Sequence, residues 1–587
     1  MEVGAARRAP RLAAALLLLA LAPAGLAAQD YVRPGEAGPL PPALQETVSG
    51  LQVARVASHI AFLAAPSLEG RGLGGNGLEA AADYVAAQLA LAGVAPPGPA
   101  AGRNPLEPYF QPVALKEISR PGGTLTLARG TGEAALRRVF RPGAQALFPE
   151  IPPGVVQGAA VFAGYGIREA APARDDYGGL DVKGKVVVLL GGLPPGPEWR
   201  TKELERRYDG EGSWRFAAKL ALAGSLGARA VVAIEGGDFA AERAKEAAAP
   251  APTFFVLAEP DSPPLPPVVR VTPRVGDQIL RVASLTAASA RSARPRPLPG
   301  VSLRLETTGR ERPVSARNVL AVIPGADPAR RGEAVVIGAH MDHLGRAGDR
   351  LYPGADDNAS GVAALLEIAR GFAASPRRPA RTLVFAFWTG EEEGHLGAAH
   401  YCRHPAWPLD RTAVYLNLDM IAHPWLRAEI EKLVADTGLE RGDEFLKAVD
   451  PSRFIELGLA EWAPDVGQVL LSAARGLGLT LHLDRTDGRS GGSDYREFAR
   501  RGVKFVRFFG NYFDGYHEPA DRVEALDPEQ VLRVARLALA SAWLLAGGSD
   551  QAEGEGTEEA GAGLTACPMR RRALIPGREP TRSRSAP

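Results

Sequence analysis

The sequence predicts an α/β fold in which buried, parallel strands carry reactive side chains at their carboxyl ends. Three apolar runs point to such strands: AVVIGAHMD, TLVFAFWTG and AVYLNLD. Runs without a polar face are typical of strands that have helices on both sides of the sheet. The helical spacing of apolar residues at 51–64 and 78–93 predicts accompanying helices.

Each of the three runs ends in residues of the kind that bind metal ions. His340 closes the first run, and Asp419 follows the third. Glu391 and Glu392 follow the second. A fourth apolar run, VKFVRFFG, precedes the segment YHEPAD, which contains His517. Ligands bind at the carboxyl ends of strands in open α/β sheets, so these side chains should converge on one crevice. The sequence therefore predicts a hydrolase site with two metal ions.

Composition narrows the classes of function. The 587 residues allow two to four domains, and the 67 glycines and 50 prolines indicate many turns. With 68 basic and 67 acidic residues the net charge is +1, which favours neither nucleic acid nor an anionic membrane surface as a partner. Only two cysteines occur, which excludes a disulfide framework and thiolate metal ligands. Histidines and carboxylates remain as ligands.

Residues 1–28 have the pattern of a secretory signal peptide. Arg7, Arg8 and Arg11 form a basic start, and the apolar segment 12–21 follows. A membrane span needs roughly 20 apolar residues, so this segment is too short for one. The expected location is secreted or periplasmic, without a stable membrane anchor after cleavage.

The helices of the N-terminal part, 45–135, flank a glycine-rich segment. Gly72, Gly74 and Gly77 spell G-x-G-x-x-G. In a dinucleotide-binding fold this motif follows a strand. Here a helix precedes it, so the motif indicates a loop with tight turns.

Residues 136–295 have a different texture, with short β-type runs separated by Gly and Pro and without a histidine. The segments GYGI, DDYGGLDVKGKVVVL and K-x-x-x-A-x-x-x-GA resemble the protease-associated domain that is inserted in several secreted peptidases. The resemblance implies a role in gating or positioning substrate, and a purely structural insert is the alternative. RSARPRPLPG, at 291–300, is a linker by composition.

The region 296–547 carries the metal-binding residues. It begins with two strand-like segments, VSLRLETTG and RNVLAVIPG, and ends in an amphipathic helix. Asp527 is the expected N-cap of this last helix, and Pro528 takes its first position. Residues 548–587 combine an acidic run with a basic one and are expected to be a disordered tail.

Neighbouring residues suggest how the ligands are oriented. Asp342 lies two residues after His340, on the same side of an extended segment, where it could accept a hydrogen bond from the far imidazole nitrogen. His343 is more typical of a solvated or capping residue. Asp356 and Asp357 precede a helix, where capping and the helix dipole explain one acidic residue but not two.

Glu391 and Glu392 should point in opposite directions if the chain is extended, so that one binds metal while the other accepts a proton. Asp521 is a candidate to orient His517. Oxygen and imidazole ligands without sulfur suit Zn²⁺ first, with Mn²⁺ or Co²⁺ as substitutes.

The motifs that carry these residues, taken in their order along the chain, resemble those of the di-zinc aminopeptidases. This family is typified by bacterial leucyl aminopeptidase, and its members are relatives of glutamate carboxypeptidase II. The resemblance covers 300–545 and the helices at 45–95. It implies a three-layer α/β/α sandwich around a mixed, mostly parallel sheet of the zinc-exopeptidase type, into which the protease-associated domain is inserted.

The resemblance also implies residue roles. Asp356 would bridge both zinc ions and be joined to Asp357 by a cis peptide bond. His340 and Asp419 would complete the first zinc site, and Glu392 and His517 the second. Glu391 would be the general base that acts on a metal-bridging water.

The expected function is an aminopeptidase that removes N-terminal residues from peptides. A carboxypeptidase or dipeptidase of the glutamate carboxypeptidase type is the first alternative, and a cationic pocket around Arg489 or Arg496 would favour it. A receptor-like scaffold without catalysis and a one-zinc glutaminyl cyclase are further alternatives. His395, Ala398 and Tyr495 stand where family members usually show Leu, Ser and His. These differences bear on which substrate is selected and not on the metal ligands.

Overall fold

The structure is a computed structural model. The signal peptide predicted at 1–28 and, apart from residue 548, the predicted tail lie outside the residues that it describes. No helix in the described part of the chain is both long and apolar enough to cross a membrane. The described residues are 30–98, 103–130, 135–143, 145–148, 153–209, 216–235, 253–259, 265–439, 441–489 and 491–548.

The predicted parallel strands are confirmed, and they form the centre of a mixed sheet. β13 (Ala334–His340) lies between β16 (Thr382–Trp388) and β17 (Thr412–Leu418) and is parallel to both. β20 (Phe505–Phe508) extends the parallel set beyond β17. Every residue of β13 and β16 is buried, because both faces of the sheet are covered.

Further strands make this sheet mixed. β18 (Phe454–Ala460) is antiparallel to β20 but parallel to β19 (Thr480–Thr486). On the other side, β12 (Arg296–Ile323) is antiparallel to β16. β1 (Tyr31–Val32) closes the far edge against β19.

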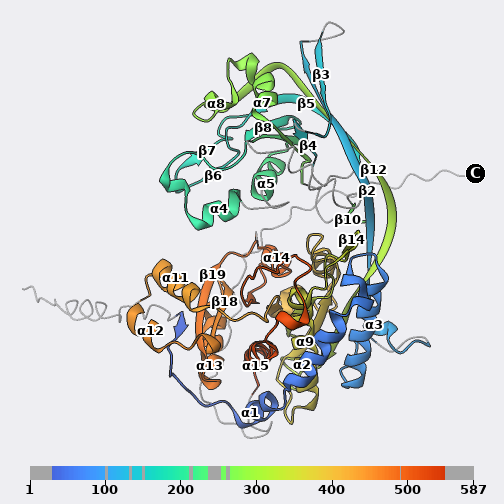
Figure 1. Ribbon diagram of the computed structural model, residues 1–587, viewed down its shortest axis with the longest axis vertical. Coiled ribbons are helices and arrows are strands. Elements are labelled where there is room, and N and C mark those ends of the chain that lie inside the picture. The colour runs from blue at the N-terminus through green and yellow to red at the C-terminus, as the bar shows by residue number, and fades with distance from the viewer. Residues whose placement is uncertain are drawn as a thin grey trace, which may run out of the picture. The chain divides into compact units, whose positions relative to one another are not determined.

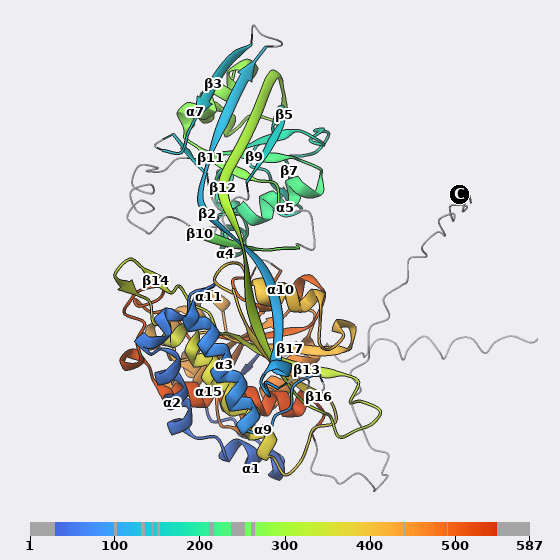
Figure 2. The ribbon, with the colours of Figure 1, turned by 90° about the vertical axis from the view of Figure 1, so that its right-hand side faces the viewer.

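Helices pack on both faces of this sheet. α2 (Val53–Leu63), α9 (Gly361–Ala374) and α15 (Pro528–Leu545) pack against one another, and α9 and α15 contact β13 and β17. Figure 2 shows them gathered on one side of the strands together with α3 (Asn76–Leu91). α14 (Tyr495–Arg500) also contacts β17. The predicted α/β/α architecture is therefore confirmed.

Two expected details of this part are also confirmed. The Asp527 side chain accepts a hydrogen bond from the backbone N–H of Glu529, and Pro528 begins α15. The glycine motif forms the loop before α3, where Gly74 has a positive φ of 75°. Gly77 lies so close to the Leu68 carbonyl that a side chain would collide with it.

The linker expected at 291–300 is wrong for its second half. β12 begins at Arg296 and continues without interruption through both predicted strand segments. Arg296 and Pro297 pair with β5 (Gly154–Phe162), because proline is tolerated at the start of a strand. Proline content alone therefore did not distinguish a linker from a strand start.

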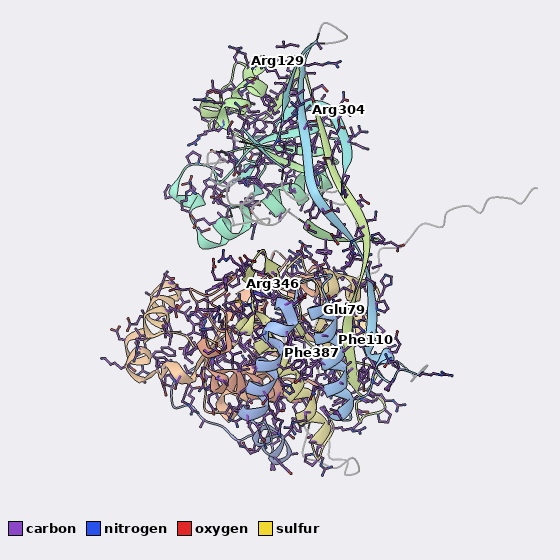
Figure 3. All side chains as sticks on the ribbon, turned by 45° about the vertical axis from the view of Figure 1, so that its right-hand side comes forward. Glu79, Phe110, Arg129, Arg304, Arg346 and Phe387 are labelled. Atoms are coloured by element: carbon purple, nitrogen blue, oxygen red, sulfur yellow. The ribbon has the colours of Figure 1, made fainter. Side chains whose placement is uncertain are left out.

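β12 runs beside β2 (Phe110–Arg129) over most of its length, in antiparallel register from Val319 opposite Phe110 to Val301 opposite Arg129 (Figure 1). Figure 3 labels Phe110 and Arg129 at the two ends of β2, with Arg304 of β12 near the far end. These two strands join the strands around β13 to those of the β-rich region.

The strands of the region 136–295 continue the same sheet beyond β12, with parallel pairs from β5 through β8 (Val186–Leu190) and β9 (Ala230–Ile234) to β11 (Val268–Val271). The buried apolar residues of this region form two clusters within 125–305. Among the described residues, the buried core around β13 includes none between 110 and 318.

The remaining elements connect and cover these sheets. They are α1 (Pro42–Ser49), β3 (Leu136–Phe140), β4 (Ala146–Leu147), β6 (Arg168–Glu169), β7 (Arg174–Asp175), α4 (Lys202–Tyr208), α5 (Ala217–Ser225), β10 (Thr253–Leu257), α7 (Pro273–Leu280), α8 (Ala287–Ala290), β14 (Arg346–Ala347), β15 (Arg350–Leu351), α10 (Leu396–Arg403), α11 (Arg427–Thr437), α12 (Gly442–Ala448) and α13 (Pro464–Gly476).

Candidate metal centre

One group of ligand atoms lies at the carboxyl end of β13. His340 Nε2 is 3.3 Å from Asp357 Oδ1 and 3.3 Å from Asp419 Oδ1. All three residues are buried. Asp419 follows the last residue of β17, and Asp357 lies in the loop before α9, so parallel strands and a helix start deliver the group.

A second group shares one of these residues. His517 Nε2 is 3.1 Å from Asp357 Oδ2 and 3.2 Å from Glu392 Oε2. The two oxygens of Asp357 therefore face two different sets of ligands. His517 lies in the loop that follows β20, in the segment YHEPAD as the sequence predicted, and has a positive φ of 54°.

The spacing of these atoms fits zinc. Ligand atoms that surround a tetrahedral zinc ion at about 2.0–2.1 Å lie about 3.3 Å from one another. The separations of 3.1–3.3 Å in both groups match this value. Three buried carboxylates close together also need positive charge, because isolated buried charges are costly. The residues present thus fit a divalent ion in each group.

The structure corrects the expectation for Asp356, which does not lie between the groups. Its Oδ1 accepts a hydrogen bond from the Ala422 N–H at 2.9 Å, and its Oδ2 is 2.7 Å from His423 Nδ1. Asp357, whose two oxygens face His340 and His517, lies between the two groups instead. The cis peptide bond follows the same shift of one residue, since it joins Asp357 to Asn358.

The role expected of Asp342 is also corrected. His340 Nδ1 lies 3.2 Å from the backbone carbonyl of Asp342 and 3.9 Å from its carboxylate. The Asp342 carboxylate instead accepts hydrogen bonds from the backbone N–H groups of Glu391 and Glu392, at 3.1 and 3.2 Å. It therefore fixes the loop that carries both glutamates.

Asp521 acts in a comparable way, and not on His517 as expected. Its two oxygens accept hydrogen bonds from the backbone N–H groups of Asp356 and Asp357, at 2.8 and 3.1 Å. Burial raises the pKa of Asp521 to about 6 although these bonds stabilise its ionised form. Asp521 thus positions Asp357 through the backbone.

Glu391 lies beside the first group without being part of it. Its Oε2 is 3.9 Å from His340 Nε2, and its Oε1 is 3.1 Å from His395 Nε2. Burial raises the pKa of Glu391 well above its usual value, and the nearby carboxylates of Asp419 and Asp494 add to this. A buried glutamate of this kind, next to a metal centre, is suited to accept a proton.

Sequence reasoning missed three residues that contact the centre. His343 Nδ1 is 2.7 Å from Glu392 Oε1, although a solvated or capping role was expected. Ser493 Oγ donates a hydrogen bond of 2.5 Å to Asp419 Oδ2. The H-M-D-H spacing offered a signal for His343, whereas nothing in the sequence around Ser493 indicated its partner.

The third missed residue is Arg71, which is fully buried behind the centre. Its guanidinium donates to the backbone carbonyls of Met341, Pro353 and Gly354, at 2.7–2.8 Å. Burial lowers the pKa of Arg71 to about 10, so the side chain remains charged at neutral pH. Arg71 ties the segment after β13 to the loop that leads to Asp357.

Comparison with known proteins agrees with this geometry. The model of peptidase family M28 matches residues 318–542, which include all the ligand atoms described above. Leupeptin-inactivating enzyme 1 of Streptomyces exfoliatus is 25% identical over 260 residues, which are 41% of this chain and 51% of that protein. The probable lipoprotein aminopeptidase LpqL of Mycobacterium tuberculosis is 30% identical over 263 residues, which are 43% of this chain and 41% of that protein. The chain thus spans about half the length, or less, of these relatives.

Solved structures of similar architecture include an aminopeptidase from Aneurinibacillus sp. strain AM-1, with 18% identity and a TM-score of 0.46 over 88% of this chain and 98% of that one. The zinc aminopeptidase BSAP from Bacillus subtilis, also at 18% identity, has a TM-score of 0.43 over 86% of this chain and 97% of that one.

Proposed function

We propose that this chain, whose residues 318–542 belong to peptidase family M28, is an exported zinc-dependent aminopeptidase that hydrolyses N-terminal residues from peptides. The carboxylate of Asp357, with one oxygen toward His340 and the other toward His517, is the observation that carries the proposal. The proposal of export rests on residues 1–28 of the sequence.

His340, Asp357 and Asp419 would hold one zinc ion, and Asp357, Glu392 and His517 a second. Bound zinc supplies Lewis-acid polarisation of a peptide carbonyl and lowers the pKa of a water molecule. Glu391 would take the proton from the attacking water, because it is the carboxylate beside the first group that is not a ligand.

The same glutamate would then deliver the proton to the leaving amine. The raised pKa of the buried carboxyl group lets Glu391 hold the proton until the leaving amine, which is the stronger base, takes it up. Asp342 would keep Glu391 and Glu392 in place through their backbone N–H groups.

The surroundings of the centre favour an aminopeptidase over the alternatives. Arg496 is buried and bonded to Glu497, and Arg489 lies over the ring of Trp462, so neither supports a pocket for a substrate carboxylate. A scaffold has no need of two complete ligand groups with a glutamate beside them. A one-zinc cyclase has no need of the second group.

Metal removal tests the proposal. Purified protein should hydrolyse aminoacyl substrates, lose this activity after dialysis against a chelator, and regain it with added Zn²⁺. N-blocked peptides and substrates with a C-terminal glutamate should be cleaved poorly, because the proposed substrate has a free N-terminus. Activity that survives complete metal removal would contradict the proposal, and preference for the C-terminal glutamate substrate would favour the carboxypeptidase alternative.

We also propose that 136–295 is an inserted domain, with 45–135 and 296–547 as the two parts of the peptidase domain. The separate buried clusters support this division, since the two regions share the β2–β12 pair but no core. The resemblance to protease-associated domains supports the identity of the insert.

Removing the insert tests this proposal. Ala114 and Ser315 are directly opposite each other on β2 and β12, so an Asn-Gly turn could replace residues 115–314, which are the insert together with the parts of β2 and β12 that pack on its core. The shortened protein is expected to fold cooperatively and to bind zinc as the full chain does, as measured by thermal unfolding and metal content. If this protein fails to fold but a version with the turn between Ser119 and Arg310 folds, the residues between the two turn positions belong to the peptidase domain. Failure of both would contradict an independent peptidase core.

A further inference from the structure

His395 has an unusual position beside the proposed general base. It is buried to 2% exposure and has a positive φ of 63°, which is uncommon for a residue other than glycine. Such backbone geometry persists only where the surroundings hold it, and it concentrates at functional sites.

The ring contacts Glu391 directly. His395 Nε2 lies 3.1 Å from Glu391 Oε1, while the other oxygen of Glu391 faces His340. The backbone fixes the same relation, since the N–H of His395 donates to the Glu391 carbonyl at 2.8 Å. The imidazole is therefore held against one side of the carboxylate.

The ring remains neutral and has a single N–H to donate. Burial, with Arg496 and Arg500 nearby, holds the pKa of His395 well below its usual value. The backbone of Gly492 is a second hydrogen-bond partner of the ring. Nε2 is the nitrogen that faces the Glu391 carboxylate, and a carboxylate is a strong hydrogen-bond acceptor, so this contact stabilises the tautomer with the N–H on Nε2.

We propose that His395 is a positioning residue for the general base. Its Nε2–H holds Glu391 Oε1 and leaves Oε2 aimed at the metal centre, where the attacking water would lose its proton. Without the imidazole, the carboxylate would rotate about its own side-chain bonds and spend less time in the productive orientation. This inference rests on the proposed function.

Two substitutions at this position separate orientation from structure. Leucine removes the hydrogen bond, whereas glutamine retains an N–H at a similar reach, and both side chains experience the same strained backbone. H395L should lower kcat about 10- to 100-fold, a part of what a general base contributes, with little change in KM or in zinc content. H395Q should recover most of kcat.

A double-mutant cycle tests the partner. If His395 acts through the Glu391 carboxylate, H395L should lower kcat much less in an E391Q background than in the wild type. His400, on the same helix and half-buried, offers the matched control, and H400L should leave kcat unchanged. Thermal unfolding of each variant monitors the fold.

The outcomes are distinct from those that test the function itself. Wild-type protein that does not hydrolyse aminoacyl substrates with zinc would overturn the proposed function. With an active wild type, equal losses in H395L and H395Q would overturn the positioning role, and so would an undiminished H395L effect in the E391Q background. Loss of zinc in H395L would assign the residue to metal binding instead.

Discussion

Asp357→Asn is expected to abolish activity and to reduce bound zinc, whereas Asp356→Asn should leave both largely intact. The asparagine at 357 keeps the size of the side chain but removes the charge and one of the two oxygens that face the ligand groups. Asparagine at 356 keeps an oxygen that accepts the Ala422 N–H, and its amide N–H can donate to Nδ1 of a neutral His423 ring. The expected loss for Asp357→Asn exceeds the roughly 10- to 100-fold loss that changes in the partners of metal ligands cause, since it removes the shared ligand of both proposed ions.

The measurement is zinc content after dialysis together with kcat on an aminoacyl substrate. Thermal unfolding of both variants controls for stability, because each substitution changes a buried hydrogen-bonded group. The opposite ranking, with Asp356→Asn metal-free and Asp357→Asn active, would restore Asp356 as the bridging residue and contradict the assignment made from the geometry.

Glu391→Gln is expected to retain zinc and to lose about 10²- to 10⁴-fold in kcat, the range that general acid–base catalysis contributes. Glutamine has the same shape but cannot take up the proton. The KM should change little, because Glu391 is not proposed to bind the substrate. Glu393→Gln, the same change two residues away in the chain, should remain close to wild-type activity.

Zinc content decides how a loss of activity is interpreted. If Glu391→Gln loses zinc in proportion to activity, Glu391 is a ligand and the proton acceptor lies elsewhere. If Glu393→Gln is equally inactive, the effect belongs to the loop as a whole and not to the carboxylate of Glu391.

The sheet was predictable because its strands are buried on both faces. In β13 and β16 every position is apolar or small up to the point where the site begins, so the end of the run marked the place of His340 and Glu391. Helix boundaries followed from local signals, such as the Asp527 and Pro528 pair at the start of α15.

The different roles of adjacent carboxylates could not be predicted in this way. Asp356 and Asp357 have the same chemistry and differ only in the local backbone, which turns one side chain toward His423 and the other toward the metal centre. Sequence spacing contains no information on such a turn in an irregular loop. Asp342 was placed near its correct partner, but its backbone carbonyl and not its carboxylate contacts His340.

Contacts between distant segments were the least predictable. Arg71 lies 270 positions before Met341 in the chain and yet donates to its carbonyl. Asp521 lies 165 positions after Asp356 and yet accepts hydrogen bonds from the backbone of Asp356 and Asp357, and no local pattern pairs these residues. Such partners depend on tertiary packing, which the periodicity of a single segment does not describe.

One short segment near the C-terminus performs two tasks. It supplies His517 to the second ligand group, and four residues later Asp521 anchors the loop that presents Asp357 to both groups. If the two groups hold zinc as proposed, ion binding and the ordering of this segment are thermodynamically linked: whatever loosens the segment weakens both sites together, and each ion that binds makes the segment more costly to displace.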